Sequence, residues 1–288
     1  ANAPTLGTQT TLLSVLLSGG TAMYITHTTK SSRRCTDMLP SITTIYGPPG
    51  TIKTSIAITW PGPIAFYNLE GGARRAWGYD EGIKNGSIIE RTFSIPHRSM
   101  TTRHEQLTGY SEAWKLLTAS MEKDLKDFQT VVWDTGTVVW AIDRDAVLQE
   151  IQAHTPARKQ LIQIEYGEPN RRITELFNLA RAFQTNLVVT HHETDEYAQL
   201  FDPMGKPILE DGKPMSVTTG KKVPEGFKHT TGLSDWVLRT TMDDAGIPKM
   251  TVEKSGYGLH MRGREIKWPT YEKLEAEVTK PVEPEGAA

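Results

Sequence analysis

A glycine- and proline-rich turn between an apolar run and a Lys-Thr pair is the feature that most constrains this 288-residue chain. Residues 41–60 read SITTIYGPPGTIKTSIAITW, and Gly47, Gly50, Lys53 and Thr54 stand where a phosphate-binding loop, G-x-x-x-x-G-K-[ST], needs them. In such a loop, backbone N–H groups surround a phosphate, the lysine supplies a positive charge and the hydroxyl ligates magnesium. The segment therefore predicts a strand, a phosphate-binding turn and a short helix, which the run Trp60-Pro61 ends.

Isoleucine at position 52 departs from this pattern, because the pattern has glycine there. Glycine allows unusual backbone angles and close approach of a phosphate, whereas a β-branched residue at positive φ costs about 1–3 kcal/mol. Two outcomes stay open, a weakened site that still turns over and a site that binds a nucleotide without hydrolysing it. The residues expected to contact the nucleotide are Gly47, Pro48, Pro49, Gly50, Thr51, Ile52, Lys53, Thr54 and Ser55.

The overall composition fits a folded protein with no global attraction to nucleic acid, since the net charge is −2 and 38% of the residues are hydrophobic. Cys35 is the only cysteine, which excludes an internal disulfide and favours a reducing compartment. The apolar run 11–25 is interrupted by glycines and is too short to span a bilayer, and no Lys or Arg precedes Lys30 as a secretory signal would require. We therefore expect a cytoplasmic protein with no membrane contact.

Short apolar runs alternate with helix-like stretches from residue 41 onward, which predicts an α/β fold with a mainly parallel sheet flanked by helices. We expect an N-terminal extension over 1–40, one domain over 41–275 and a disordered tail over 276–288. Turn signals within 202–225 predict a hairpin-like insertion. Strands are expected at 41–47, 63–70, 86–95, 130–134, 186–192, 235–242 and 249–255, and helices at 111–128, 137–153 and 171–183.

Two acidic residues stand at the ends of apolar strand-like runs, Glu70 in FYNLE and Asp134 in VVWD. An aspartate in this position holds magnesium in phosphate-loop enzymes, and hydrolysis needs a carboxylate that orients and deprotonates the attacking water. Asp134-Thr135-Gly136 is also the signature of aspartic proteases, but that chemistry needs a second such carboxylate and no second D-[ST]-G occurs in the chain. Each residue also has a plainer interpretation, as a solvated residue at a strand end.

The stretch THHETDE contains two adjacent histidines, His191 and His192, at the end of a strand-like run. Because neighbouring side chains of a strand point to opposite faces, the two histidines cannot easily bind one metal ion. A polar residue at this strand end is instead well placed to contact a terminal phosphate, although either histidine could equally be structural.

These four pieces, in this order, resemble the RecA-like ATPase core, and more closely the phage RecA-type nucleotide-binding proteins that assist single-strand annealing and recombination. The resemblance covers about 41–275 and rests on GPPGTIKT, AFYNLEGG, VVWDT and THHETDEY. It implies ATP and Mg²⁺ as ligands, with Lys53, Thr54 and Asp134 at the phosphates and metal, Glu70 activating water and His192 as the phosphate sensor. It also implies location in the host cytoplasm if the chain is of phage origin.

A late stretch, EKSGYG, resembles a motif of the related RadA proteins whose lysine reaches the nucleotide of a neighbouring subunit. Lys254 matches that lysine and implies a homo-oligomer, but Gly256 stands where the motif has arginine.

In RecA-like recombinases the segment after the sensor strand contacts DNA, and here it runs from Glu193 to His229. Lysines neutralise phosphates and aromatic side chains stack on unpaired bases, which suits single-stranded DNA, while acidic residues nearly cancel the charge. A second basic group lies at 158–159 and 171–172. The aromatic residues expected to stack on bases are Tyr197, Phe201 and Phe227.

The function expected from the sequence is ATP hydrolysis coupled to annealing or recombination of single-stranded DNA. Two alternatives stay open: a nucleotide-binding module that does not hydrolyse, and a motor or assembly ATPase that does not act on DNA.

Overall fold

The computed structural model describes residues 38–96, 107–210 and 213–280. The extension expected over 1–40 therefore lies almost entirely outside the described residues. In this part of the chain, no helix combines the length and the apolar character needed to cross a membrane.

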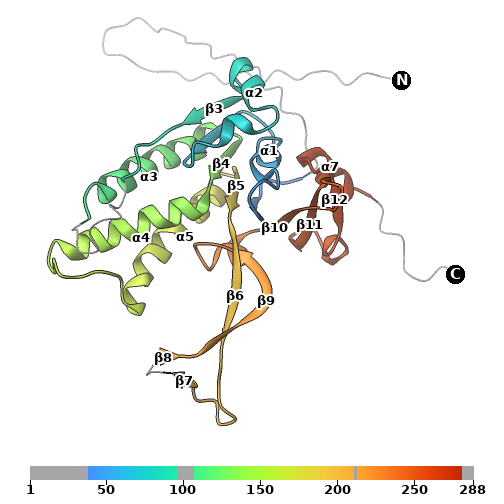
Figure 1. Cartoon of the computed structure of the whole chain (residues 1–288). Helices are drawn as coiled ribbons and strands as arrows, with labels where there is room; N and C mark the ends of the chain where they lie inside the picture. The colour runs from blue at the N-terminus through green and yellow to red at the C-terminus, as the bar shows by residue number, and fades with distance from the viewer. Residues whose placement is uncertain (1–37, 97–106, 211–212, 281–288) are drawn as a thin grey trace, which may run out of the picture. The chain divides into compact units, whose positions relative to one another are not determined.

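The unit from Leu39 onward is built on an eight-stranded sheet of order β12-β11-β10-β1-β5-β4-β2-β3 (Figure 1). All strands from β10 to β3 in this order run parallel, and β11 and β12 complete the sheet antiparallel at one edge. This confirms the predicted α/β fold with a mainly parallel sheet. The strands are β1 (Ile42–Tyr46), β2 (Ile64–Asn68), β3 (Ile88–Arg91), β4 (Thr130–Asp134), β5 (Asn186–His191), β10 (Trp236–Met242), β11 (Pro248–Ser255) and β12 (Glu265–Lys267).

Helices connect the parallel strands, and most of them coincide with the apolar periodicity of the sequence. The last helix, α7, ends at Val278 and so extends into the segment that the sequence assigns to the tail. The helices are α1 (Lys53–Ala57), α2 (Tyr79–Asn85), α3 (Tyr110–Asp127), α4 (Gly136–Gln152), α5 (Gly167–Ala182), α6 (Thr230–Leu233) and α7 (Tyr271–Val278), with 3-10 turns η1 (Ala73–Arg75), η2 (Gln163–Tyr166) and η3 (Leu259–Met261).

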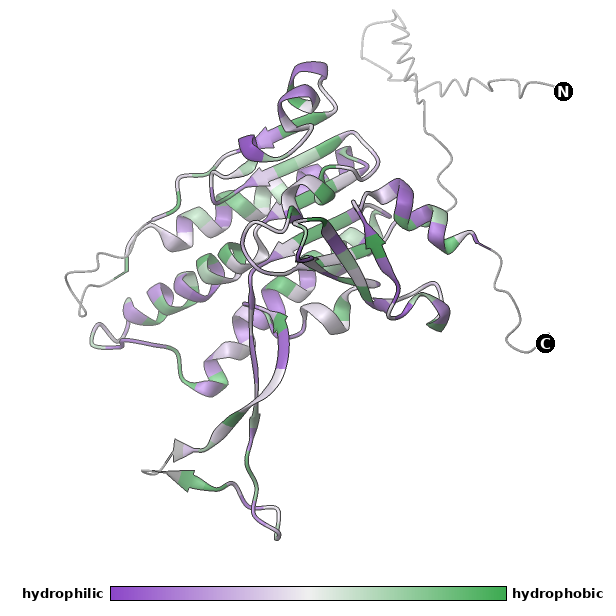
Figure 2. Ribbon diagram, turned by 45° about the vertical axis from the view of Figure 1, so that its right-hand side comes forward, coloured by the Kyte–Doolittle hydropathy of each residue, from purple (hydrophilic) through white to green (hydrophobic). Residues whose placement is uncertain are grey.

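The central strands are buried on both faces, as near-continuous apolar runs predict, and Figure 2 shows hydrophobic colour along them. Alternate residues of one strand pack against different layers. Tyr67 of β2 belongs to the core shared with α3, α4 and α5, whereas Phe66 contacts Tyr79 of α2, with ring centroids 5.3 Å apart. The sheet therefore forms the middle layer between two groups of helices.

A two-stranded antiparallel ribbon leaves the sheet immediately after β5 and extends away from it (Figure 1). It consists of β6 (Glu193–Gln199) and β9 (Ser216–Pro224), and beyond them the short strands β7 (Leu209–Glu210) and β8 (Lys213–Pro214) pair with each other. The ribbon begins earlier than the insertion expected at 202–225. The difference arises because β6, ETDEYAQ, is too polar to show the alternation of a half-buried strand.

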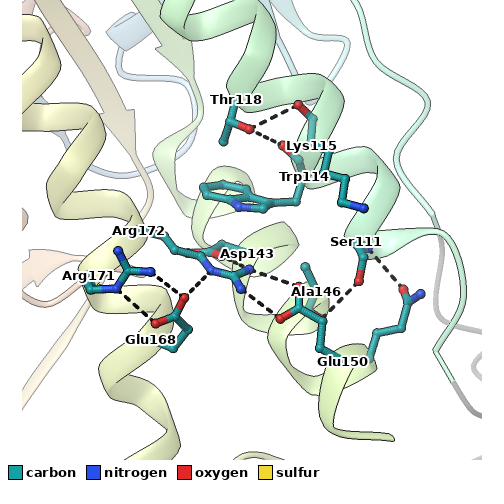
Figure 3. A network of polar contacts seen from close by, with 11 residues as sticks. Ser111, Trp114, Lys115, Thr118, Asp143, Ala146, Glu150, Glu168, Arg171 and Arg172 are labelled. Carbon is teal, nitrogen blue, oxygen red and sulfur yellow. Dashed lines mark hydrogen bonds and ion pairs between the residues drawn. The ribbon is translucent and has the colours of Figure 1, made fainter. Parts of the chain in front are cut away.

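The basic residues of α5 form an ion-pair network that joins this helix to α4 (Figure 3). Arg172 contacts Glu168 and Glu150, each at 2.8 Å, while its Nη1 lies 3.6 Å from a carboxylate oxygen of Asp143. Asp143 is fully buried, and its oxygens have no hydrogen-bond partner among the described residues. Burial raises the pKa of the Asp143 carboxyl to about 8, although Arg172 opposes the shift.

Replacement of Asp143 by asparagine should remove a pH-dependent loss of stability. Because the pKa is raised in the folded state, the protonated carboxyl is favoured there, and its stability contribution is lost as pH rises from about 4 toward about 8. Asp143→Asn should therefore match the wild type near pH 4 and exceed its free energy of unfolding by several kcal/mol at pH 8. Urea unfolding at both pH values measures this.

The matched control is Glu122→Gln, which changes an exposed carboxylate of α3. It should leave the difference between the two pH values unchanged. If Asp143→Asn and the wild type lost the same stability between pH 4 and pH 8, Asp143 would not be the source of the pH dependence.

Candidate functional site

The loop after β1 has the curved backbone that the glycine-rich sequence predicts. Gly47 has φ +155° beside β10, and a Cβ built there would lie 2.3 Å from the carbonyl oxygen of Thr240, so only glycine fits. Ile52 adopts φ 59° and ψ 21°, the left-handed region, although it is β-branched. The backbone of the loop therefore takes up a positive φ at position 52 without glycine.

Lys53 opens α1 with its side chain buried against the loop. Its Nζ donates to the carbonyl oxygens of Gly47 at 2.9 Å and Pro48 at 2.8 Å. Burial lowers the pKa of the Lys53 ammonium, while Asp134 and Glu70 act in the opposite direction. The lysine thus lies within the turn, where it can exchange these carbonyls for an anion.

The carboxylate of Asp134, at the end of β4, lies between two threonine hydroxyls. Thr54 of α1 donates to its Oδ2 at 3.0 Å, and Thr190 of β5 donates to its Oδ1 at 2.5 Å. Burial raises the pKa of Asp134, and the two hydroxyl hydrogen bonds oppose that shift. Thr54 and Asp134, which the sequence assigns to one metal site, therefore lie in direct contact.

Glu70 faces the same place from the end of β2. Its Oε1 accepts from the hydroxyl of Thr135 at 3.0 Å and from Nε2 of His192 at 2.7 Å. The side chains of Glu70 and His192 are each 35% exposed, so both can be reached from solvent. The structure therefore joins Glu70 and His192, which are 122 positions apart in the sequence.

His191 points away from this cleft into the protein. It is buried, and its Nδ1 donates to the carbonyl oxygen of Glu225, 2.9 Å away. Burial lowers the pKa of His191 to about 4, so the ring is neutral at physiological pH. In residues 38–96, 107–210 and 213–280, no three His, Cys, Asp or Glu side chains are grouped so that they could hold a metal ion.

One cleft with a volume of about 490 Å³ is lined by the residues expected at the phosphates, the metal and the attacking water: Lys53, Thr54, Glu70, Asp134 and His192. Arg75 and Trp77, from the turn after β2, also line it, and sequence reasoning missed both. The backbone N–H of Trp77 donates to the hydroxyl of Ser55 at 3.1 Å, which holds this turn against α1. Trp77 is 58% exposed and its ring lies 5.6 Å from that of Trp268. The signal available in the sequence was a tryptophan a few residues after an acidic strand end.

The tripeptide Asp134-Thr135-Gly136 has a structural explanation here. Thr135 is the N-cap of α4, accepting from the N–H of Val138, and a Cβ on Gly136 would lie 2.3 Å from the Val189 side chain. Asp134 itself contacts threonines rather than a second carboxylate. This geometry gives each residue a role that has no connection with protease chemistry.

Several basic and aromatic residues expected at DNA or at a neighbouring subunit are engaged within the chain. The expectation for Phe227 is wrong, because its ring is 2% exposed and packs against Trp140 and Phe177. Lys222 pairs with Asp195 at 2.8 Å. In the other basic group, Arg158, Arg171 and Arg172 all pair with glutamates.

Lys254, expected to reach a neighbouring subunit, is bound within its own chain. Its Nζ donates to the carbonyl oxygens of Thr231 at 2.9 Å and Gly232 at 3.0 Å. The conformation described here therefore directs this lysine toward α6.

The parallel sheet, the turn after β1 and the carboxylates at the ends of β2 and β4 define a phosphate-loop nucleotide-binding protein of the α/β class. Comparison with protein families agrees, since the model described as an AAA domain matches residues 40–261. The match covers more than half of the chain, and the chain belongs to this family. A search of curated proteins found no match to the chain.

Replacing Ile52 by glycine should stabilise the protein. The left-handed conformation costs an L-residue about 1–2 kcal/mol, and the greater freedom of unfolded glycine offsets about 0.5–1 kcal/mol of that gain. Ile52→Gly should therefore raise the melting temperature by about 1–4 °C, measured by calorimetry.

Ile58→Gly is the matched control, since Ile58 has φ −79° and gains no relief of strain. Its melting temperature should fall. An equal fall in Ile52→Gly would show that the isoleucine is not strained.

Proposed function

We propose that the chain binds ATP with Mg²⁺ and hydrolyses it, in the service of single-stranded DNA handling of the RecA-like type. The observation that carries the proposal is the convergence of Lys53, Thr54, Glu70 and Asp134 on one cleft. These four side chains supply a cation for the phosphates, two oxygen donors and a carboxylate for water.

The donor set suits magnesium. The Thr54 hydroxyl and the Asp134 carboxylate are hard oxygen ligands, and Mg²⁺ in nucleotide sites is held by one or two protein oxygens together with waters and phosphates. A bound Mg²⁺ would supply neutralisation of charge on the outer phosphate oxygens.

Glu70 is the candidate general base. Its carboxylate would take a proton from the water that attacks the terminal phosphorus, as the bond from that phosphorus to the bridging oxygen of the leaving diphosphate breaks. The Thr135 hydroxyl and His192 both donate to Glu70 Oε1, which fixes the direction of the carboxylate. His192 would sense the terminal phosphate, because its ring is hydrogen-bonded to Glu70, the candidate general base.

Trp77 is the candidate contact for the base of the nucleotide. Its ring lines the cleft and is largely exposed, and stacking on a base face stabilises a bound nucleobase by about 1–3 kcal/mol. Stacking requires no particular pattern of donors on the base, so we expect weak discrimination between purines.

Glu70→Gln should separate binding from hydrolysis. The amide keeps the size of the side chain but cannot accept the proton, so turnover should fall by about 10²–10⁴-fold with the ATP dissociation constant nearly unchanged. Lys53→Ala should abolish both binding and turnover. Phosphate release and calorimetric titration with Mg-ATP measure the two effects.

Glu81→Gln, an exposed carboxylate of α2, is the control and should behave as wild type. ATP binding by the wild type without any turnover, with or without single-stranded DNA, would favour the non-hydrolysing module instead.

The ribbon formed by β6 and β9 is the candidate contact for single-stranded DNA. Tyr197 and Phe201 are 65% and 55% exposed, and Lys206 and Lys221 are also exposed. However, residues 193–229 contain seven acidic residues against five lysines, so phosphate neutralisation there is limited. Base stacking would have to contribute much of the affinity.

The double variant Tyr197→Ala/Phe201→Ala should weaken binding of a labelled single-stranded oligonucleotide by about 10-fold or more, because two stacking contacts are lost. A titration at two salt concentrations measures it, with ATP turnover as the control for folding. Absence of salt-dependent oligonucleotide binding in the wild type would favour a motor or assembly ATPase.

A further inference from the structure

The cleft contains a cation that the proposed mechanism does not use. Among the described residues that line it, Lys53 and Arg75 carry the permanent positive charges, and Glu70 and Asp134 are the carboxylates. Lys53 is held by the carbonyl oxygens of Gly47 and Pro48 inside the turn. A nucleoside triphosphate carries several negative charges, and a bound Mg²⁺ together with one lysine would still leave part of that charge unmatched at the Glu70 end.

Arg75 comes from the 3-10 turn η1, five residues after Glu70, and its side chain is exposed. Within the described residues, its guanidinium takes part in no side-chain hydrogen bond or ion pair. Other arginines differ in this respect: the guanidinium of Arg91, for example, forms an ion pair with Asp124 at 2.8 Å. Arg75 therefore has its planar donor fork free for a ligand.

The position of Gly72 indicates where that guanidinium lies. Gly72 has φ −88° and ψ −10°, which any residue can adopt, so its backbone does not require glycine. A Cβ built on Gly72 would lie 3.3 Å from Nη2 of Arg75. The guanidinium is thus folded back over Gly72, two residues from Glu70, at the end of the cleft where hydrolysis would take place.

No cation from β11 fills this role in the described conformation. Lys254 is bound to carbonyl oxygens of α6, and position 256 is glycine. Arg75 is accordingly the described side chain best placed to add a second positive charge to the cleft from within the same chain.

We propose that Arg75 binds the terminal phosphate of a nucleoside triphosphate in its own chain and gives the cleft its preference for triphosphate over diphosphate. Arginine suits this task because its fork makes two parallel hydrogen bonds to phosphate oxygens. The inference rests on the proposed nucleotide function and adds a residue that selects the ligand.

The test compares ATP with ADP. Calorimetric titrations in Mg²⁺ should show that Arg75→Ala weakens ATP binding by about 10- to 100-fold, the range for a hydrogen bond to a charged group, and ADP binding by less than about 3-fold. Arg75→Lys should fall between, because lysine keeps the charge but loses the paired geometry.

Arg74→Ala is the matched control, because Arg74 is the exposed neighbour that does not line the cleft. It should bind ATP and ADP as wild type does. Thermal unfolding of each variant confirms folding, and Arg75→Lys serves as the test if Arg75→Ala does not fold.

Unchanged ATP affinity in Arg75→Ala, or an equal loss for ATP and ADP, overturns the inference. If Lys53→Ala still abolishes ATP binding in that case, the proposed nucleotide function is retained and only the role of Arg75 is rejected. A wild-type protein that binds neither ATP nor ADP overturns both. Because the readout is binding, the result does not depend on whether Ile52 permits turnover.

Discussion

The carboxylate of Asp134, held between the hydroxyls of Thr54 and Thr190, is the contact on which the arrangement of the cleft depends. It joins the helix after β1 to the ends of β4 and β5, three segments far apart in sequence. A buried carboxylate without such partners would cost several kcal/mol, so the hydroxyls both offset its burial and determine where its oxygens point. The neighbouring pair of Glu70 and His192 extends the same row of polar groups toward solvent.

The turn after β1 shows that backbone shape and residue type can be separated. The pattern has glycine at position 52, yet Ile52 takes the left-handed conformation, and Thr51 bonds to Pro48 and Thr240 across the turn. These contacts and the packing of Lys53 hold the loop in place against the local preference of isoleucine. Such strain is retained where the surrounding structure determines the conformation.

Much of the fold could be predicted because its signals are local. Buried strands appear as apolar runs, and the carboxyl ends of parallel strands meet at one edge of a sheet. The positions of Glu70, Asp134 and His192 at the ends of such runs therefore predict that they lie near one another. Features set by tertiary contacts could not be read in the same way. The sequence predicts a helix from residue 111, but α3 begins at Tyr110 with Gly109 as its N-cap, and Phe227, expected to stack on bases, belongs to the core. Arg75 and Trp77 lie on a turn whose path depends on the hydrogen bond from Trp77 to Ser55.

The ribbon formed by β6 and β9 is attached to the sheet next to His192, so its orientation depends on the contacts at that point. Its outgoing strand starts directly after His192, and its returning strand ends at Pro224. The next residue, Glu225, has its backbone hydrogen-bonded to His192, His191 and Thr137. Seven residues of β6 span about 23 Å, so a tilt of about 10° at that root displaces the far end of the strand by about 4 Å. Because His192 belongs both to the cleft and to the base of the ribbon, a small change of orientation at that base produces a larger displacement at the far end of the ribbon.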